Sequence, residues 1–386
     1  MSIHISGTGS VSCTGFGTEN LFEAVFANQS GVVEGLGKIP SPVAADLHAH
    51  YPEAFQKSLP LGYAYAAALQ AMQKAGWTKL NPDDGIILAT TTGQISRWEP
   101  DLIRFLKGEG SSAEFSEPFS HQSLGFCLTE LANLLQFQGR TQLITSACSA
   151  GTQAIALASL WIQSGKVKRC LVGGVEILSE LTTAGFGSLQ LLLKEPARPF
   201  DQNRHGINLS EASAFLCLEK NARAPLAQIS GYGFSTDAYH LASPEPEGAG
   251  CLHAMKLALK KANLEPSAIQ WVHAHGTGSK ANDQAECAAV NHLFPENPPW
   301  ISSTKYIHGH ALGASGTLET VLCVEALQKG VILKTGGLEI PDVSLHAKHP
   351  KENIKIVYDH ILKNTLGFGG NNAALVISRA SIGSAR

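Results

Sequence analysis

Apolar positions fall into two kinds of segment along the chain, and together they predict alternating strands and helices. Short, nearly continuous apolar runs predict strands at residues 3–9, 85–90, 142–144, 170–175, 212–219 and 373–377. Longer segments predict helices at residues 19–28, 64–75, 129–136 and 153–163. The last of these is apolar on nearly every face, which predicts a helix buried all round, and the run at 142–144 before it predicts a buried strand. Residues 29–51 and 95–122 are expected to be irregular or rich in loops.

The second half of the chain repeats features of the first. Residues 5–9 return at 229–233, an offset of 224, and the helix that begins near Gly151 returns near Gly316, an offset of 165. A repeat this long indicates a duplicated domain. We therefore expect an α/β fold in two similar halves, 1–225 and 226–386, with the two apolar helices packed on each other between sheets. The offsets differ by 59 residues, which we assign to insertions in the stretches 29–60 and 95–125.

Composition excludes several classes of protein. With 386 residues, 44% hydrophobic and 16% charged, the chain is expected to be compact, and its net charge of −3 argues against nucleic acid or an anionic membrane as a partner. The eight cysteines are scattered without a C-x-x-C pair, which indicates a reducing compartment and not a disulfide framework. No signal peptide and no run of 18 apolar residues is found, so a cytoplasmic location is expected.

The stretch 145–152, T-S-A-C-S-A-G-T, joins a predicted strand to the apolar helix and places Cys148 at the turn. Unpaired N–H groups and the positive end of the helix dipole lie there, and both favour a thiolate. Cys148 is therefore a candidate nucleophile. The alternative is an inert, buried, apolar thiol, as most cysteines are.

Two histidine pairs in the second half are candidates to accompany this cysteine. His273 and His275 end a predicted strand, and His308 and His310 precede the second apolar helix. Under the repeat, His310 lies three residues before the counterpart of Cys148, so the two occupy matching loops that a duplicated fold can bring together. His275 can join them, whereas structural roles are expected for His273 and His308.

Other kinds of site remain open at this point. Two His-x-His pairs could bind zinc, with Asp283 as a further ligand, but this would leave the cysteine turn unexplained. Residues 276–281 mimic the G-x-G-x-x-A dinucleotide pattern, yet the acidic residue expected about 20 positions on is missing. The glycine-rich stretch 367–372 is either a tight hairpin or a loop that presents a backbone N–H to an oxyanion, with Phe368 as an apolar gate.

Five motifs taken in order resemble the β-ketoacyl-acyl carrier protein synthases over essentially the whole chain. They are Cys148 in T-S-A-C-S-A-G, His275 in A-H-G-T, Lys305 in S-T-K, His310 in G-H-A-L-G-A-S-G and Phe368 in G-F-G-G. The likeness is to the elongating type, which has a Cys-His-His triad. It implies a thiolase-like fold of five layers, α-β-α-β-α, built from two similar halves, and it also implies a dimer of like or unlike chains.

The resemblance implies a role for each motif residue. Cys148 would take an acyl group from an acyl carrier protein, with the backbone N–H groups of Cys148 and Phe368 holding the oxyanion. His275 and His310 would donate hydrogen bonds to a malonyl thioester, so that the enolate left by CO₂ attacks the acyl group in a Claisen condensation. Lys305 would orient the site through a carboxylate, for which Glu286 is the candidate. No metal or other cofactor is implied.

Departures from the family pattern point to a specialised pathway of the polyketide or aryl polyene kind more than to housekeeping fatty-acid synthesis. The R-D-G stretch reads Arg204-His205-Gly206 here, and of the usual basic cluster before the helix at 64–75 only Lys57 remains. Docking of an acidic carrier protein would then depend on Lys194, Arg198 and Arg204.

Two other functions compete with the condensing enzyme. One is a synthase-like partner subunit that controls chain length, although such subunits usually lack the cysteine. The other is a thiolase or acyltransferase that uses CoA thioesters.

Overall fold

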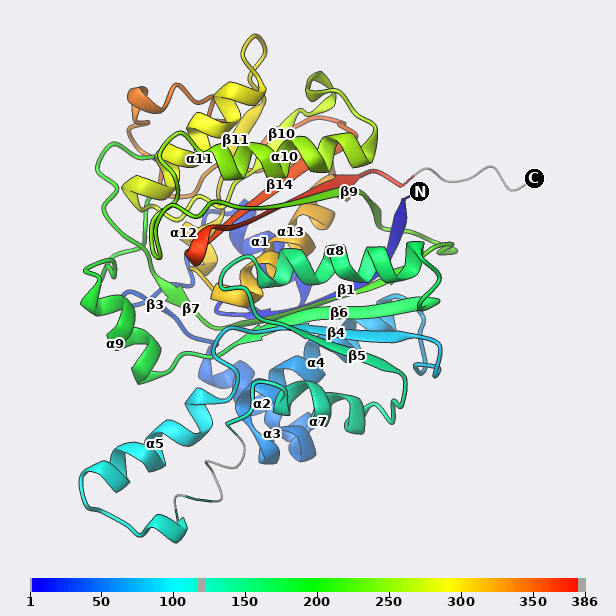
Figure 1. Ribbon diagram of the computed structural model, residues 1–386, viewed down its shortest axis with the longest axis vertical. Helices are drawn as coiled ribbons and strands as arrows, with labels where there is room; N and C mark the ends of the chain where they lie inside the picture. The colour runs from blue at the N-terminus through cyan, green and yellow to red at the C-terminus, as the bar shows by residue number, and fades with distance from the viewer. Residues whose placement is uncertain (1, 115, 117–121, 381–386) are drawn as a thin grey trace.

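The computed structural model describes residues 2–114, 116 and 122–380 and has five layers (Figure 1). Its strands are β1 Ile3–Ser12, β2 Gly15–Phe16, β3 Leu36–Gly37, β4 Gly85–Ala89, β5 Arg140–Ile144, β6 Arg169–Glu176, β7 Leu209–Ser210, β8 Ala212–Glu219, β9 Ala227–Thr236, β10 Trp271–His273, β11 Trp300–Ser302, β12 Val331–Ile332, β13 Ile354–Lys355, β14 His360–Gly367 and β15 Asn371–Ser378. Its helices are α1 Thr18–Phe26, α2 Ser41–His50, α3 Pro52–Lys57, α4 Leu59–Lys74, α5 Ile95–Leu106, α7 Phe126–Leu134, α8 Ala150–Gln163, α9 Glu180–Ser188, α10 Ala249–Ala262, α11 Lys280–Leu293, α12 Lys305–His308 and α13 Ser315–Lys329.

One large mixed sheet supplies both β layers. Its strand order is β11-β10-β14-β15-β9-β1-β8-β6-β4-β5, with β2 added beside β1. The sheet folds around α8 and α13, while α10 and α11 cover its outer face on one side and α4 and α7 cover it on the other (Figure 1). This confirms the α/β, five-layer arrangement predicted from the resemblance.

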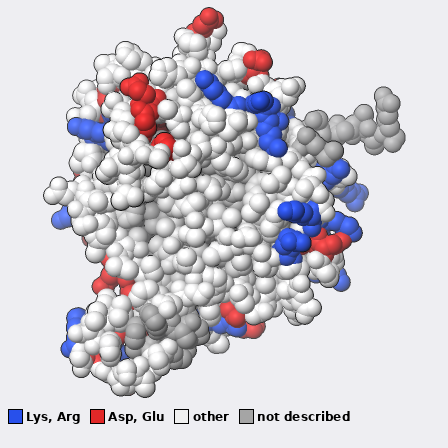
Figure 2. All heavy atoms as spheres, in the orientation of Figure 1, with Lys and Arg blue, Asp and Glu red and all other residues white. Residues whose placement is uncertain are grey.

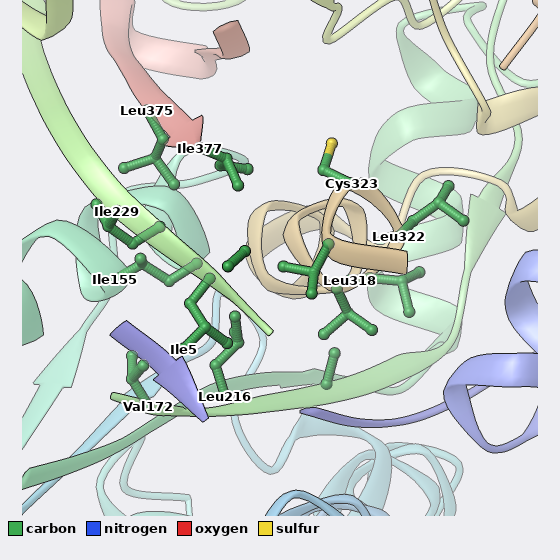
Figure 3. Close-up of a cluster of buried hydrophobic side chains, with 14 of the residues drawn as sticks. Ile5, Ile155, Val172, Leu216, Ile229, Leu318, Leu322, Cys323, Leu375 and Ile377 are labelled. Atoms are coloured by element: carbon green, nitrogen blue, oxygen red, sulfur yellow. The ribbon is translucent and has the colours of Figure 1, made fainter. Parts of the chain in front are cut away.

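The central layer is the core of the molecule. Ile155 on α8 and Leu318 and Leu322 on α13 pack between apolar side chains of the two β layers, such as Leu216 and Leu375 (Figure 3). All five of these side chains are fully buried. The two helices predicted to pack on each other between sheets therefore do so.

Matching glycines show the duplication at the level of packing. A Cβ on Gly7 would overlap the backbone of α4 at Ala71, and a Cβ on Gly231 would overlap the backbone of α10 at Ala258. The two pairs are related by offsets of 224 and 187, and the α8–α13 pair by 165. Of the 59 extra residues, 37 therefore precede α4 and 22 lie between α4 and α8, as the two assigned insertions require.

Some local predictions were wrong. The stretch 29–51 contains α2, in which only Leu47 is buried, so an apolar pattern hardly marks it. The stretch 95–122 contains α5, which carries Pro100 inside the helix. Residues 115 and 117–121 of that stretch lie outside the described residues.

The predicted burial of the segment around the cysteine turn was also too complete. Strand β5 ends the sheet, where Gln142 is exposed and Ile144 only half-buried. Helix α8 leaves Leu160 46% exposed. Within the described residues, no helix has the length and apolar character needed to cross a bilayer.

Candidate active site

Cys148 lies in the turn between β5 and α8, two residues before the first residue of the helix. The preceding residue, Ala147, has a φ of 50°, a left-handed conformation that is uncommon for a residue with a Cβ. The turn is therefore sharp, as the sequence predicted. The thiol points into a pocket and is only 4% exposed.

His310 contacts this thiol directly. It lies between α12 and α13, and its Nε2 is 3.1 Å from Cys148 Sγ. Its other ring nitrogen, Nδ1, is 2.9 Å from the hydroxyl of Ser315 at the start of α13. The predicted meeting of these two loops at the centre of the fold is therefore present.

His275 follows β10 and completes the group. Its ring centroid is 5.1 Å from that of His310, with the ring planes nearly perpendicular. Lys305 Nζ lies 3.3 Å from His275 Nδ1. Because an ammonium can only donate, Nδ1 is the acceptor, and the ring proton is on Nε2.

The carboxylate that holds Lys305 is Glu319 and not Glu286. Lys305 Nζ donates to Glu319 Oε1 and, at 2.6 Å, to the backbone carbonyl of His275. Glu286 instead accepts the backbone N–H groups of His275 at 2.7 Å and Gly276 at 2.8 Å. It holds the strand end from which His275 projects, so the predicted Lys305–Glu286 pair was wrong.

Burial dominates the electrostatics of the site. It raises the pKa of the Cys148 thiol to about 11, although the charge of Lys305 and the backbone N–H of Phe368 act in the opposite direction. The expected preference for a resting thiolate is therefore absent. Burial, helped by Lys305, also lowers the pKa of His310 to about 3 and that of His275 well below its ordinary value. Both imidazoles are therefore neutral at pH 7.

Phe368 and the pocket complete the arrangement. The backbone N–H of Phe368 faces Cys148 Sγ, and its ring stacks on that of Phe186 with centroids 5.6 Å apart. The pocket has a volume of about 560 Å³ and opens beside exposed polar side chains. Its apolar wall is formed by Phe186, Leu189, Leu191, Ile207, Leu366 and Phe368.

The geometry does not fit the other kinds of site. His273 and His308 both bond to Thr304 Oγ1, at 3.1 and 2.8 Å, so the two His-x-His pairs do not form a four-histidine zinc site. In the described part of the chain, the side chains whose potential metal-ligand atoms lie close together are Cys148, His275 and His310, which are the three residues of the predicted triad.

The backbone N–H groups of the glycine loop at 276–278 bind carboxylates of the protein itself. The N–H of Gly276 donates to Glu286 and that of Gly278 to Asp283, so neither is directed at a pyrophosphate. Asp283 also accepts the N–H of Phe200 at 2.9 Å, which accounts for its burial without a metal role.

Arg204, one of the three cations expected to dock a carrier protein, is engaged in other contacts, and so is Lys57, the remnant of the usual basic cluster. Arg204 is buried and pairs with Asp342 at 2.6 Å, so its predicted docking role was wrong. Lys57 pairs with Glu130. Arg198 also has an acidic neighbour, Glu339 at 2.9 Å, but remains 39% exposed.

Family models for the β-ketoacyl synthase N-terminal and C-terminal domains match residues 52–224 and 226–339. The chain belongs to the β-ketoacyl synthase family. It is a ketosynthase-type acyltransferase, as predicted from the motifs, and its Cys-His-His triad is that of the elongating type.

Individual relatives agree with the family assignment. This ketosynthase is 33% identical over 340 residues to a 3-oxoacyl-[acyl-carrier-protein] synthase 2 of Synechocystis sp., covering 82% of this chain and 80% of that one. It matches the ishigamide ketosynthase/chain length factor with a TM-score of 0.90 and 27% identity, over 98% and 99% of the two chains. It matches a ketosynthase in complex with its chain length factor from Xenorhabdus doucetiae with a TM-score of 0.83 and 28% identity, over 98% of each chain.

Sequence reasoning missed three polar residues of this ketosynthase that support the site, namely Ser315, Glu319 and Lys363. The first two belong to the second apolar helix, whose overall pattern concealed them, and Lys363 lies on β14 among apolar neighbours. The signal that could have found them is a charged or hydroxyl side chain within a segment that otherwise reads as core.

Proposed function

We propose that this ketosynthase catalyses the decarboxylative Claisen condensation of a malonyl thioester with an acyl group held on Cys148, both delivered by an acyl carrier protein. The single observation that carries the proposal is the contact of 3.1 Å between Cys148 Sγ and His310 Nε2, with His275 beside it in the same pocket. A thiol, two neutral imidazoles and a backbone N–H are the groups that both half-reactions need.

The first half-reaction is acyl transfer. Because burial keeps Cys148 protonated, its S–H proton passes to His310 Nε2 as the sulfur adds to the thioester carbonyl. The N–H groups of Cys148 and Phe368 hold the oxyanion. When the tetrahedral intermediate collapses, the pantetheine thiolate leaves and takes the proton from His310, and the acyl group stays on Cys148.

The second half-reaction forms the carbon–carbon bond. The Nε2–H of His275, whose position Lys305 fixes, and that of His310 donate to the thioester carbonyl of the malonyl group. CO₂ leaves with cleavage of the carbon–carbon bond to the carboxylate, and its electron pair forms the enolate. The enolate carbon attacks the acyl carbonyl, the β-ketoacyl thioester departs, and the Cys148 thiolate takes up one proton from solvent to restore the thiol.

The two halves of the chain would divide these tasks. Residues 1–225 carry the nucleophile, and residues 226–386 carry both histidines, Lys305 and Phe368. A boundary at 225/226 is supported by its position between β8 and β9. The scattered, unpaired cysteines support action in the cytoplasm.

A dimer is also part of the proposal. Strand β5 pairs only with β4 within the described residues, so its other edge can accept a strand from a second subunit. The middle of the face over α8 carries no Lys, Arg, Asp or Glu in Figure 2. Leu160, a residue of α8, is an exposed apolar side chain. Such a face is typical of a subunit interface.

The second candidate is a partner subunit that controls chain length. It is favoured by the likeness to solved ketosynthase and chain length factor assemblies. It is opposed by the presence of Cys148 and both histidines, which a subunit without catalysis does not require.

Intact-mass measurement separates the candidates. The purified protein is incubated with an acyl carrier protein bearing an acyl group, and then with the malonyl form. We expect a mass gain on the Cys148 peptide that the malonyl form discharges as a β-ketoacyl product, and no gain in Cys148→Ala. No gain from any carrier or CoA thioester, alone or with a partner subunit, would contradict the acyl-enzyme. A gain from CoA thioesters only would favour the CoA-dependent acyltransferase.

A further inference from the structure

Behind His275 lies a buried cluster of three charged side chains. Lys305 on α12, Glu319 on α13 and Lys363 on β14 are 2%, 0% and 0% exposed in their side chains. Full burial of three ionisable groups is costly unless each is paired, so the cluster requires a physical reason.

Lys305 uses all its N–H groups within the cluster and the site. Its Nζ contacts Glu319 Oε1, the carbonyl oxygen of His275 at 2.6 Å and His275 Nδ1 at 3.3 Å. A change in the charge of the cluster is therefore transmitted directly to His275.

Lys363 is held as completely as Lys305. Its Nζ lies 3.0 Å from Glu319 Oε2 and donates to Thr365 Oγ1 and, at 3.1 Å, to Thr152 Oγ1. Three oxygen atoms around one nitrogen suit an ammonium, which has three protons to donate. Thr152 belongs to the first turn of α8, four residues after Cys148 in the chain.

Two ammonium groups share one carboxylate, so the cluster carries a net charge of +1. We propose that Lys363 is a positioning residue of this ketosynthase: its charge leaves the cluster net positive and so stabilises the negative charge that forms on Cys148 and on the enolate beside His275. This rests on the proposed function only for the enolate. For the thiolate it rests on the geometry of the cluster alone.

The other titratable groups around the cluster do not cancel this charge. Burial alone would raise the pKa of Glu319, but Lys305 and Lys363 hold it well below its usual range. Burial lowers the pKa of His273 to about 3 and of His308 to about 4, which leaves both neutral, and the Cys323 thiol stays protonated.

Two buried carboxyl groups outside the cluster are less readily ionised than usual. Burial raises the pKa of Glu286 to about 7 and raises that of Glu176, whose charge acts on Cys148. Burial likewise lowers the pKa of Lys363, while Glu319 opposes this shift. The buried positive charge is therefore free to interact with the anion that each half-reaction creates in the pocket.

Alkylation of Cys148 by iodoacetamide tests the inference without any carrier protein. Between pH 7 and 9 the rate follows the thiolate fraction, and peptide mapping separates Cys148 from the other seven cysteines. The test variant is Lys363→Gln, which keeps donors for the threonines and removes the charge. We expect alkylation to be about tenfold slower at each pH, which corresponds to a rise of about one unit in the pKa of the Cys148 thiol.

Two further variants exclude a merely structural effect. Lys363→Arg keeps the charge and should alkylate within about twofold of the parent protein, since the charge sets the thiolate fraction. Cys323→Ala perturbs the same core without changing its charge and should behave like the parent. An unchanged rate in Lys363→Gln, or an equal loss in Cys323→Ala, would overturn the proposal.

The kinetic form of the test uses the malonyl substrate. Lys363→Gln should lower kcat for condensation about tenfold and leave KM unchanged, because the charge acts on the developing anion. If the parent protein failed to condense, the proposed function would fail, while the alkylation rates would still decide the role of Lys363.

Discussion

At the scale of single residues, His310 has to serve two half-reactions that need opposite protonation of Nε2. Acyl transfer needs Nε2 as an acceptor for the Cys148 proton, and condensation needs it as a donor. The Ser315 hydroxyl, 2.9 Å from Nδ1, can either donate or accept. It can therefore support both tautomers, which a backbone group with one fixed role cannot.

Ser315→Ala should consequently slow both half-reactions. We expect a loss of about tenfold in each, equivalent to about 1.4 kcal/mol, because one hydrogen bond to the imidazole is removed. The rate of Cys148 acylation in the absence of the malonyl substrate measures the first step, and single-turnover condensation measures the second. Ser159→Ala is the matched control, since that buried hydroxyl donates to the carbonyl of Ile155 at 2.9 Å. Equal rates in Ser315→Ala and the parent would exclude the role.

The site could be predicted at this scale only where chemistry is tied to a local motif. Cys148, His275 and His310 each stand in a short, distinctive stretch, and the structure brings them together. The partner of Lys305 was predicted wrongly because Glu286 and Glu319 are both buried carboxylates on helices. Which of them meets the lysine depends on how α11 and α13 pack, and a single sequence does not record that.

At the scale of secondary-structure elements, the crossing of α8 and α13 holds the two halves of the site together. Gly151 on α8 faces Gly313 and Thr317, and Gly316 on α13 faces Thr152. These glycines let the helix backbones approach closely, and each helix carries one side of the site at its N-terminal end. The spacing of the helices therefore sets the distance between Cys148 and His310.

Gly316→Ala tests this dependence on close approach. The added Cβ would overlap the backbone and side chain of Thr152, so we expect a loss of about 2 kcal/mol in the free energy of unfolding and slower acylation of Cys148. Chemical denaturation and intact-mass kinetics measure the two effects. Gly185→Ala on α9 is the control, because a Cβ there meets open space. Similar stability of the two variants would refute the packing argument.

The elements themselves were predicted best where burial is deep. Strands β4, β6 and β8 match their apolar runs because both faces are covered. Helix α5 was missed, and it contains Pro100, a residue that is usually unfavourable inside a helix. For α8 and β5 the type of element was predicted correctly, but the apolar pattern predicted more burial than a single chain provides. The sequence does not show whether an apolar residue such as Leu160 is covered by its own chain or by another chain.

At the scale of the whole molecule, buried neutral histidines make stability depend on pH. Burial lowers the pKa of His308 from 6.5 to about 4. A group whose folded pKa is lowered binds fewer protons in the folded state, so its contribution to stability is present above pH 6.5 and is lost as the pH falls toward 4.

His308→Asn should therefore flatten the acid side of the stability profile. Between pH 7 and 5 we expect the parent protein to lose about 2 kcal/mol more unfolding free energy than the variant. The reason is that pH 5 lies about 1.5 pH units below the ordinary pKa of histidine, and each unit contributes about 1.36 kcal/mol. Urea denaturation at the two pH values gives the comparison. Groups with opposite shifts, such as Glu286, act in both proteins and cancel. Parallel losses would mean that the pKa of His308 in the folded protein lies close to its ordinary value.

The proposed dimer can be tested through the uncharged face over α8 (Figure 2). Leu160 is 46% exposed in the single chain, so Leu160→Glu should leave the monomer folded but place a charge within the interface, where an unpaired charge is costly. We expect light scattering to show a shift from dimer to monomer, or loss of a co-expressed partner subunit if the dimer is of unlike chains.

Val357→Glu, at a position 78% exposed after β13, is the control and should leave assembly unchanged. Since the chain passes from the edge strand β5 directly into the turn that carries Cys148, the monomeric variant should also acylate more slowly. A Leu160→Glu protein that remains dimeric would move the interface away from α8, and the free edge of β5 would then need another explanation.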